Sequence, residues 1–186
     1  MSRAVIVVDM LKDNLGDVSR PGIGQQAAVI LPRLQWLLAS ARDRGWRVIY
    51  ACDSFFPEDF IFRGRMKAHA LRGTSGAGII DDLRPQPGDL VLEKRLFSAF
   101  ARTDLDLTLR YKGIEEVGVT GISTPYCVLL TALDAVGNGF RAVILEDCCA
   151  AHKEEVHRAT LDIYRQNPLY PLLRVIKAED FLAENR

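Results

Sequence analysis

The stretch Val119-Thr-Gly-Ile-Ser-Thr-Pro-Tyr-Cys-Val-Leu-Leu-Thr-Ala-Leu-Asp134 changes character in its middle, and that change decides the fold. It opens as the end of a short apolar run, which predicts a buried strand that breaks at Gly121. Apolar side chains then recur at helical spacing, so Ser123 or Thr124 can cap a helix and the following proline suits its first turn. Cys127 falls in that first turn, where unpaired N–H groups and the helix dipole favour thiolate over thiol.

Further apolar runs lie on both sides of this stretch, and helical patterns separate them. Strands are predicted at 4–8, 46–52, 89–93, 116–120, 141–145 and 172–176, and helices at 26–44, 105–112 and 152–165 besides the central one. Near-continuously apolar strands that alternate with helices predict an α/β fold of three α-β-α layers, with a six-stranded, mainly parallel sheet. The segment 54–88 is a long loop, and such loops are usually functional. No repeat or linker is evident, so residues 1–186 are predicted to form one domain.

Charged or reactive residues follow five of the predicted strands. They are Asp9, Asp53, Lys94, Cys127 and Asp147. The carboxyl ends of parallel strands meet at one edge of a sheet, and ligands of such sheets bind there. We therefore predict an active site at this edge, with Asp147 more suited to capping a turn than to chemistry.

The chemistry of these groups centres on a cysteine nucleophile, which needs a base to take its proton. Asp9 could accept the proton of Cys127, while Lys94 would keep Asp9 ionised before attack and stabilise the thiolate afterwards. Backbone N–H groups around Ser123, Thr124 and Cys127 could form an oxyanion hole. A nucleophile, a base, a cation and an oxyanion hole together support a two-step reaction. The cysteine attacks an amide carbonyl to form a covalent thioester, and water then hydrolyses the thioester.

Composition narrows the classes of partner. The chain has 24 Lys and Arg against 24 Asp and Glu, so no net charge draws it to nucleic acid or to a membrane. No apolar run approaches the length of a membrane span and no signal peptide precedes the first strand, which predicts a cytoplasmic protein with a small-molecule substrate. The four cysteines lack the spacing of zinc or redox motifs, so reduced thiols are expected.

Three blocks of sequence carry a resemblance to a known family. They read AVIVVDM at 4–10, EKRLFSAF at 93–100 with Thr103, and VTGISTPYCV at 119–128 with TALDA at 131–135. In this order they resemble the isochorismatase-like cysteine hydrolases, a superfamily that includes nicotinamidases, N-carbamoylsarcosine amidase and ureidoacrylate amidohydrolase. The resemblance runs from about Arg3 to Ile176 and implies a six-stranded parallel sheet with helices on both sides.

The resemblance also implies roles for particular residues. Asp9, Lys94 and Cys127 correspond to a catalytic triad, and a non-proline cis peptide is implied between Ile122 and Ser123, where it would aim backbone N–H groups at the oxyanion. True isochorismatases act on a vinyl ether and lack a cysteine at the nucleophile position. A chain with Cys127 resembles the amide and carbamoyl hydrolases instead.

The sequence differs from the nicotinamidases at the residues that bind their metal ion. Nicotinamidases hold a metal through an Asp, a His two residues later and a further His. Asp53 and His69 match the first and last of these, but Phe55 replaces the middle ligand. Two ligands rarely hold a divalent ion, so we expect no cofactor, with Asp53 and His69 as the weak metal candidates.

Aromatic side chains near the predicted site are expected to line a small apolar pocket. The expected lining is Phe55, Phe60, Phe62, His69, Phe97, Phe100 and Tyr126. Arg63, Arg65 and Arg72 could meet a carboxylate on the substrate, and His152 and His157 are expected on the surface of a helix.

The favoured function is a hydrolase that cleaves the C–N bond of a small amide or carbamoyl compound through a Cys127 thioester. One alternative is an isochorismatase-type vinyl ether hydrolase without covalent catalysis. Another is a non-catalytic protein that binds a small ligand on the same fold, since a fold does not fix a function. The resemblance further implies a homo-oligomer, a dimer or a tetramer.

Overall fold

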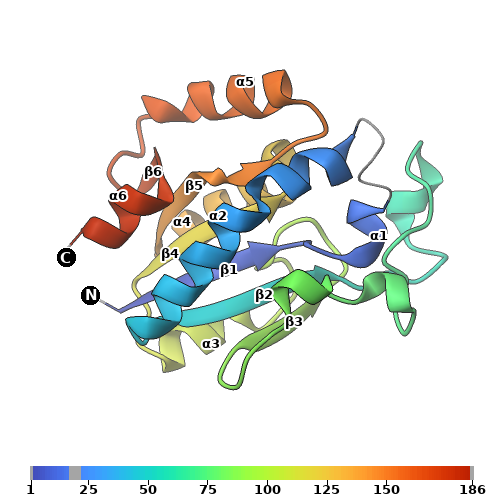
Figure 1. Cartoon of the computed structure of the whole chain (residues 1–186), viewed down its shortest axis with the longest axis horizontal. Coiled ribbons are helices and arrows are strands. Elements are labelled where there is room, and N and C mark those ends of the chain that lie inside the picture. The colour runs from blue at the N-terminus through green and yellow to red at the C-terminus, as the bar shows by residue number, and fades with distance from the viewer. Residues whose placement is uncertain (1, 17–21, 185–186) are drawn as a thin grey trace.

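A six-stranded sheet runs through the middle of the computed structural model, which describes residues 2–16 and 22–184 (Figure 1). Its strands are β1 (Arg3–Val8), β2 (Arg47–Asp53), β3 (Leu90–Lys94), β4 (Glu116–Ile122), β5 (Arg141–Ala150) and β6 (Leu173–Ile176). All neighbouring strands are parallel, in the order β3-β2-β1-β4-β5-β6. The predicted six-stranded parallel sheet is therefore confirmed.

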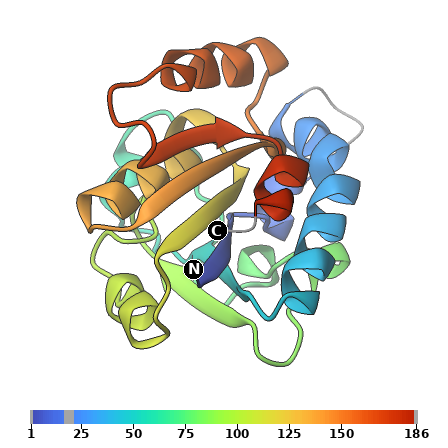
Figure 2. The same ribbon diagram turned by 90° about the vertical axis from the view of Figure 1, so that its left-hand side faces the viewer.

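Helices cover both faces of this sheet. They are α1 (Lys12–Leu15), α2 (Ile23–Asp43), α3 (Leu105–Tyr111), α4 (Leu129–Gly137), α5 (Glu154–Arg165) and α6 (Ala178–Ala183). Figure 2 shows α2 and α6 on one side of the sheet and α3 and α4 on the other. Side chains of β1 alternate between the two cores, Val5 and Val7 packing on the α2 side and Ile6 and Val8 on the α3 and α4 side. Among the described helices, none has both the length and the apolar character that crossing a membrane requires.

The predicted long loop connects β2 to β3 and has little regular structure. Its ordered pieces are three single 3₁₀ turns, Phe60–Arg63, Ser75–Ala77 and Asp81–Leu83. Isolated bridges pair Phe55 with Leu71 within the loop and Leu11 with Ile79, next to the end of β1. The loop therefore lies at the edge of the sheet where β1 ends.

The predicted break of the central strand at Gly121 is wrong, because β4 continues to Ile122. Gly121 has a φ of +95°, and a Cβ atom placed there would lie 2.1 Å from the carbonyl oxygen of Val8 on β1. Only glycine permits this backbone and this close approach of the two strands. The glycine is thus part of the strand pairing beside the predicted site.

The prediction that Asp147 follows a strand end is also wrong. β5 runs on to Ala150, with a shift of register against β4, so Asp147 lies within the strand. Its carboxylate pairs with Arg33 of α2 at 2.8 Å and accepts a hydrogen bond from the backbone N–H of Ala178 at 2.8 Å. Asp147 therefore fastens α2 and α6 to the sheet, away from the other four groups.

The helix after β4 starts differently from the prediction, because no side chain caps it. The chain first makes one π-helical turn, Thr124–Val128, and α4 follows. The N–H groups of Tyr126 and Val128 both donate to the carbonyl of Ser123, at 3.0 and 3.3 Å. Isolated π turns of this kind are frequent at functional sites.

A buried ion network holds the opposite, amino-terminal edge of the sheet. Glu116 on β4, fully buried, pairs with Arg3 at 2.8 Å and with Arg174 at 2.9 Å. We expect Glu116→Gln to lower the free energy of unfolding by about 3 kcal/mol, because two buried guanidinium groups lose the more deeply buried of the two carboxylates that they share, the other being Glu184. Urea denaturation measures the loss, with the exposed neighbour Glu115→Gln as control. Similar losses in both variants would contradict this role of the network.

Candidate active site

Three side chains meet at the edge of the sheet formed by the carboxyl ends of its central strands. β1 and β4 lie next to each other there, at the point where the strand order reverses and ligands of open α/β sheets bind. Asp9 follows β1, and Lys94, the last residue of β3, reaches across β2 to place its Nζ 2.9 Å from an oxygen of Asp9. The Sγ atom of Cys127 lies within 4.8 Å of that carboxylate. The structure thus brings together the three residues predicted to act together.

Asp53 is a fourth member of this group. Its carboxylate accepts a hydrogen bond from the ammonium of Lys94, and its backbone N–H donates to Asp9 at 2.9 Å. The four side chains are nearly inaccessible, with whole-residue exposures of 2% for Asp9, 5% for Asp53, 1% for Lys94 and 7% for Cys127. Asp53 was predicted at this edge of the sheet and as a weak metal candidate, and its contact with Lys94 was not predicted.

The electrostatics of the group set the protonation of its members. Burial alone lowers the pKa of Lys94, but the charges of Asp9 and Asp53 outweigh it and raise the pKa, so the ammonium stays protonated. Burial, together with the charge of Asp9, raises the pKa of Asp53. The same two causes raise the pKa of Cys127 well above its usual range. The resting cysteine is therefore a thiol, which corrects the expectation that its helix position yields a thiolate.

The backbone at Asp9 is unusual for a residue with a side chain. Its φ is +53°, in the left-handed region that aspartate tolerates better than most residues. The carbonyl of Asp9 accepts hydrogen bonds from the N–H of Leu11 at 2.8 Å and from the Asn14 side chain at 2.9 Å. These bonds hold the tight reversal after β1, and such conformations cluster at functional sites.

A cavity of about 240 Å³ opens over Cys127 and reaches the carboxylates. Of the predicted residues, its lining includes Asp53, His69, Phe97, Ile122, Ser123 and Tyr126. Asn14, Ile23, Ile61, Met66 and His152 also line it and were missed by the sequence analysis. They come from α1, the start of α2, the long loop and the turn after β5, and no local pattern indicates that these segments converge.

Four aromatic residues expected to line this cavity lie elsewhere, and three of them, Phe55, Phe62 and Phe100, pack in the interior or under the long loop. Phe55 is fully buried and packs edge-on against Phe62 and His69, with ring centroids 5.4 and 5.6 Å apart. Phe100 packs against Phe140 at 6.0 Å, under the sheet face that α3 and α4 cover. These rings hold loops onto the sheet, as large apolar side chains usually do.

The turn between β4 and Cys127 has two notable features. The peptide bond between Ile122 and Ser123 is cis, as the resemblance implies. The hydroxyl of Thr124, fully buried, is hydrogen-bonded to Nδ1 of His157 on α5 at 2.9 Å. The prediction of a surface position for His157 is wrong, since its exposure is only 8% and burial lowers its pKa. The signal was available, because His157 lies four residues before the buried Leu161 and shares its helix face.

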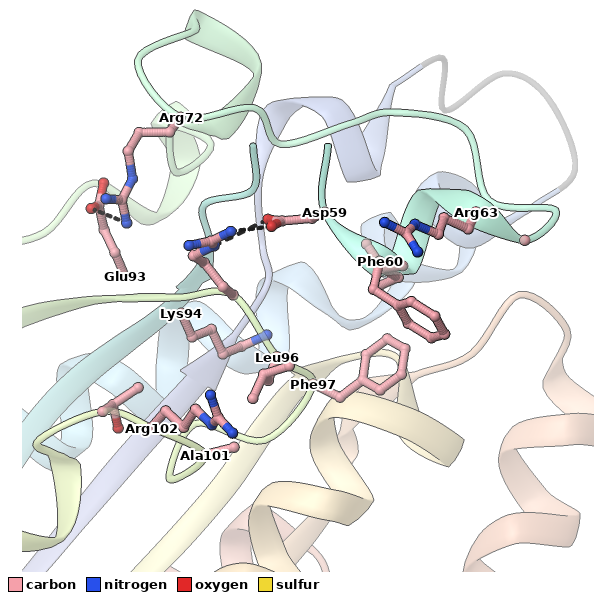
Figure 3. Close-up of a pocket in the computed structure, with 14 residues that line it drawn as sticks. Asp59, Phe60, Arg63, Arg72, Glu93, Lys94, Leu96, Phe97, Ala101 and Arg102 are labelled. Carbon is pink, nitrogen blue, oxygen red and sulfur yellow. Dashed lines mark hydrogen bonds and ion pairs between the residues drawn. The ribbon is translucent and has the colours of Figure 1, made fainter. Parts of the chain in front are cut away.

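A second and larger space, a cleft of about 1030 Å³, adjoins the cavity (Figure 3). Ile61 and Phe97 line both spaces, so they form the wall between them. Phe60, expected beside the cysteine, lines only this cleft, and the stem of Lys94 borders it as well.

The residues present do not fit a divalent metal ion. Asp9, Asp53 and Cys127 offer ligand atoms within 4.8 Å of one another, but the ammonium of Lys94 already binds both carboxylates. Nδ1 of His69 lies 2.9 Å from a backbone carbonyl and its ring packs on Phe55. The carboxylates of Asp9 and Asp53 therefore bind the ammonium of Lys94 in the place where a metal ion would need them.

The fold and the site together define a class, hydrolases with a three-layer α-β-α architecture and a buried cysteine beside a carboxylate and an ammonium. The chain belongs to the isochorismatase family, whose isochorismatase domain model matches residues 3–174. It is 31% identical over 170 residues to an uncharacterized isochorismatase family protein, PncA, of Bacillus subtilis, with 84% of this chain and 91% of the relative covered.

Solved structures show the same fold. N-carbamoylsarcosine amidase of Thermoplasma acidophilum has a TM-score of 0.82 and 31% identity, with 96% of this chain and 98% of that one covered. Pyrazinamidase of Pyrococcus horikoshii, solved in complex with zinc, has a TM-score of 0.82 and 25% identity, with 95% and 99% covered. The likeness extends over nearly the whole chain in both cases.

Proposed function

We propose that the chain is a cysteine hydrolase that cleaves the C–N bond of a small amide or carbamoyl compound through a thioester on Cys127. The observation that carries the proposal is the Lys94–Asp9 ion pair placed against the Cys127 thiol at the floor of a small cavity. The carboxylate can take the thiol proton only as sulfur attacks, because the resting pKa of Cys127 is raised. The likeness to an amidase supports the same chemistry.

The reaction then proceeds in two balanced halves. Sγ of Cys127 bonds to the carbonyl carbon while its proton passes to Asp9, and collapse of the tetrahedral intermediate breaks the C–N bond as Asp9 protonates the leaving nitrogen. Water next attacks the thioester, giving a proton to Asp9, and the acid product leaves as that proton returns to sulfur. Lys94 stabilises the negative charge that moves between Asp9 and Cys127 throughout.

The turn at the start of the π helix is the proposed oxyanion hole. The backbone N–H groups of Ser123, Thr124 and Cys127, positioned after the peptide of Ile122, would stabilise the developing negative oxygen. Ile122, Ser123 and Cys127 line the cavity. The hydrogen bond of Thr124 to His157 fixes this turn from behind.

Ammonia release and intact-protein mass spectrometry test the function on a panel of small amides and carbamoyl compounds. Nicotinamide, N-carbamoylsarcosine, ureidoacrylate and maleamate are its first members, because similar proteins are named for them. We expect release of ammonia with an acyl adduct of the wild-type chain for at least one compound. Turnover without any adduct would instead favour direct attack by water.

The Thr124–His157 bond predicts a selective loss of turnover. We expect Thr124→Val to lower kcat by roughly tenfold with little change in KM, because the oxyanion turn loses its fixed position. The rate of alkylation of Cys127 by iodoacetamide stays unchanged, since that displacement forms no oxyanion. Thr160→Val, which removes a hydroxyl bonded within α5, is the control. Equal losses in turnover and alkylation would instead indicate general disruption of the site.

Independence from metal is a further expected result. Dialysis against EDTA should leave the rate of ammonia release unchanged, and added Zn²⁺ should not raise it, because Lys94 neutralises the carboxylates that a metal would need. Loss of activity in EDTA that zinc restores would contradict this prediction, even though Asp53 and His69 both border the cavity.

Assembly into a homo-oligomer stays a prediction. Tyr126 and Leu130 are 55% and 37% exposed and lie four residues apart, on the side of the helical segment that faces solvent. Exposed apolar side chains of this kind are suited to a subunit interface. Light scattering that finds a monomer at micromolar concentration would contradict it.

A further inference from the structure

The larger cleft beside the cavity has an excess of positive charge. Its charged lining, besides Lys94, consists of Arg63, Arg72, Arg95, Arg102, Asp59 and Glu93. Four guanidinium groups thus face two carboxylates, in a chain whose acidic and basic residues are equal in number. The ammonium of Lys94 adds nothing here, because it is turned to Asp9 and Asp53 beneath the cavity.

Two of the four arginines that line the cleft form ion pairs with its carboxylates. Arg95 pairs with Asp59, and Arg72 pairs with Glu93 at 3.1 Å (Figure 3). Neither Arg63 nor Arg102 forms an ion pair with any residue that the structure describes. Two positive charges of the cleft therefore have no anionic partner within residues 2–16 and 22–184.

The surroundings of these two arginines indicate what they could bind. In Figure 3 they lie on opposite sides of Leu96 and Phe97. Arg63 lies over the ring of Phe60, 5.7 Å from its centroid, and that ring is 81% exposed. Arg102 has a φ of +58°, a conformation that is uncommon for a residue with a side chain and that occurs preferentially at functional sites and in tight turns. The cleft thus combines free guanidinium groups with exposed apolar surface.

We propose that this cleft binds the carboxylate of the substrate, so that the chain acts on amides that carry an anionic group on a flat, apolar body. The inference rests on the proposed function and narrows its substrate class. A planar guanidinium pairs with a carboxylate through two parallel hydrogen bonds, which gives both affinity and orientation. Because Ile61 and Phe97 border both spaces, a molecule held in the cleft can extend past them and present its amide to Cys127.

Benzoate and benzamide form the matched pair of probes for this site, since they differ in charge and share a flat ring. Both are titrated by NMR into the wild-type chain and into Cys127→Ala, which keeps benzamide intact. We expect benzoate to bind at least about tenfold more tightly than benzamide in both proteins, a difference of about 1.4 kcal/mol. Arg63→Gln and Arg102→Gln should each weaken benzoate binding about fivefold and leave benzamide unchanged.

Two further variants separate charge from structure. Arg65→Gln removes an exposed arginine of the same loop that does not line the cleft, and should bind benzoate as the wild type does. Arg63→Lys keeps the charge but loses the paired hydrogen bonds of the guanidinium, so its affinity for benzoate should lie between those of Arg63→Gln and the wild type. Absence of benzoate binding, equal binding of benzoate and benzamide, or an equal loss in Arg65→Gln would each overturn the proposal.

The benzoate-binding experiment and the turnover of Cys127→Ala test two separate proposals, so one can fail while the other stands. Should Cys127→Ala abolish turnover while benzoate and benzamide bind alike, the carboxylate site is wrong and the hydrolase stands. Should benzoate bind selectively through Arg63 and Arg102 while turnover survives in Cys127→Ala, the carboxylate site stands and the thioester mechanism is wrong.

Discussion

Cys127→Ala is expected to lose amide hydrolysis by at least about 10⁴-fold and to form no acyl adduct. The sulfur is the only nucleophile placed against the Asp9–Lys94 pair among the residues that line the cavity, so its removal abolishes the covalent route. Ammonia release measures the rate, and intact-protein mass spectrometry during turnover measures the adduct. Both are recorded on the same compound, the one that the wild-type chain hydrolyses fastest.

Cys148→Ala is the matched control for this variant. Cys148 is a free, fully buried thiol on β5 that packs in the core on the α2 side and does not line the cavity. It should keep the wild-type rate and the adduct. If Cys127→Ala kept most of its rate, water activation by Asp9 would replace the thioester mechanism, as in the vinyl ether hydrolases. If neither protein turned over any amide, a ligand-binding role would gain support.

Lys94→Met is expected to cause the second large effect, a loss of kcat of about 10³-fold together with a loss of stability of about 3 kcal/mol. The methionine fills the buried volume, but Asp9 and Asp53 are left as two neighbouring carboxylates without their shared cation. One of them must then take up a proton, and Asp9 is no longer a reliable acceptor for the Cys127 proton. Steady-state kinetics and urea denaturation measure the two losses.

The double variant Lys94→Met/Asp53→Asn distinguishes the two consequences. Removing one carboxylate relieves the repulsion, so we expect most of the lost stability to return. Activity should stay low, because no cation stabilises the charge on Asp9 and Cys127. Lys112→Met, at the exposed end of α3, is the control and should resemble the wild type in both measurements. A normal kcat in Lys94→Met would show that Lys94 has no role in the mechanism.

Much of the fold could be predicted because its signals are local. Each strand is a short apolar run, so the alternation of strands and helices and the parallel sheet followed from the sequence alone. The meeting of Asp9, Lys94 and Cys127 followed as well, since each comes after a strand. Their catalytic roles stay a prediction until the variants are measured.

What the sequence did not predict depends on contacts between distant segments. The extension of β5 past Asp147 depends on a shift of register against β4, which no pattern within β5 encodes. Asn14 and Ile23 reach the cavity because α1 and the start of α2 fold over the end of β1. The raised pKa of Cys127 results from burial beside two carboxylates, whereas the sequence revealed only the favourable helix position.

The protonated resting state of Cys127 determines where the hydrogen atoms of the released ammonia come from. Under the proposed mechanism the hydrogen on sulfur before the substrate arrives passes to Asp9 and leaves on the nitrogen. The first half of the cycle therefore needs no hydrogen from bulk solvent, and a closed cavity does not hinder it.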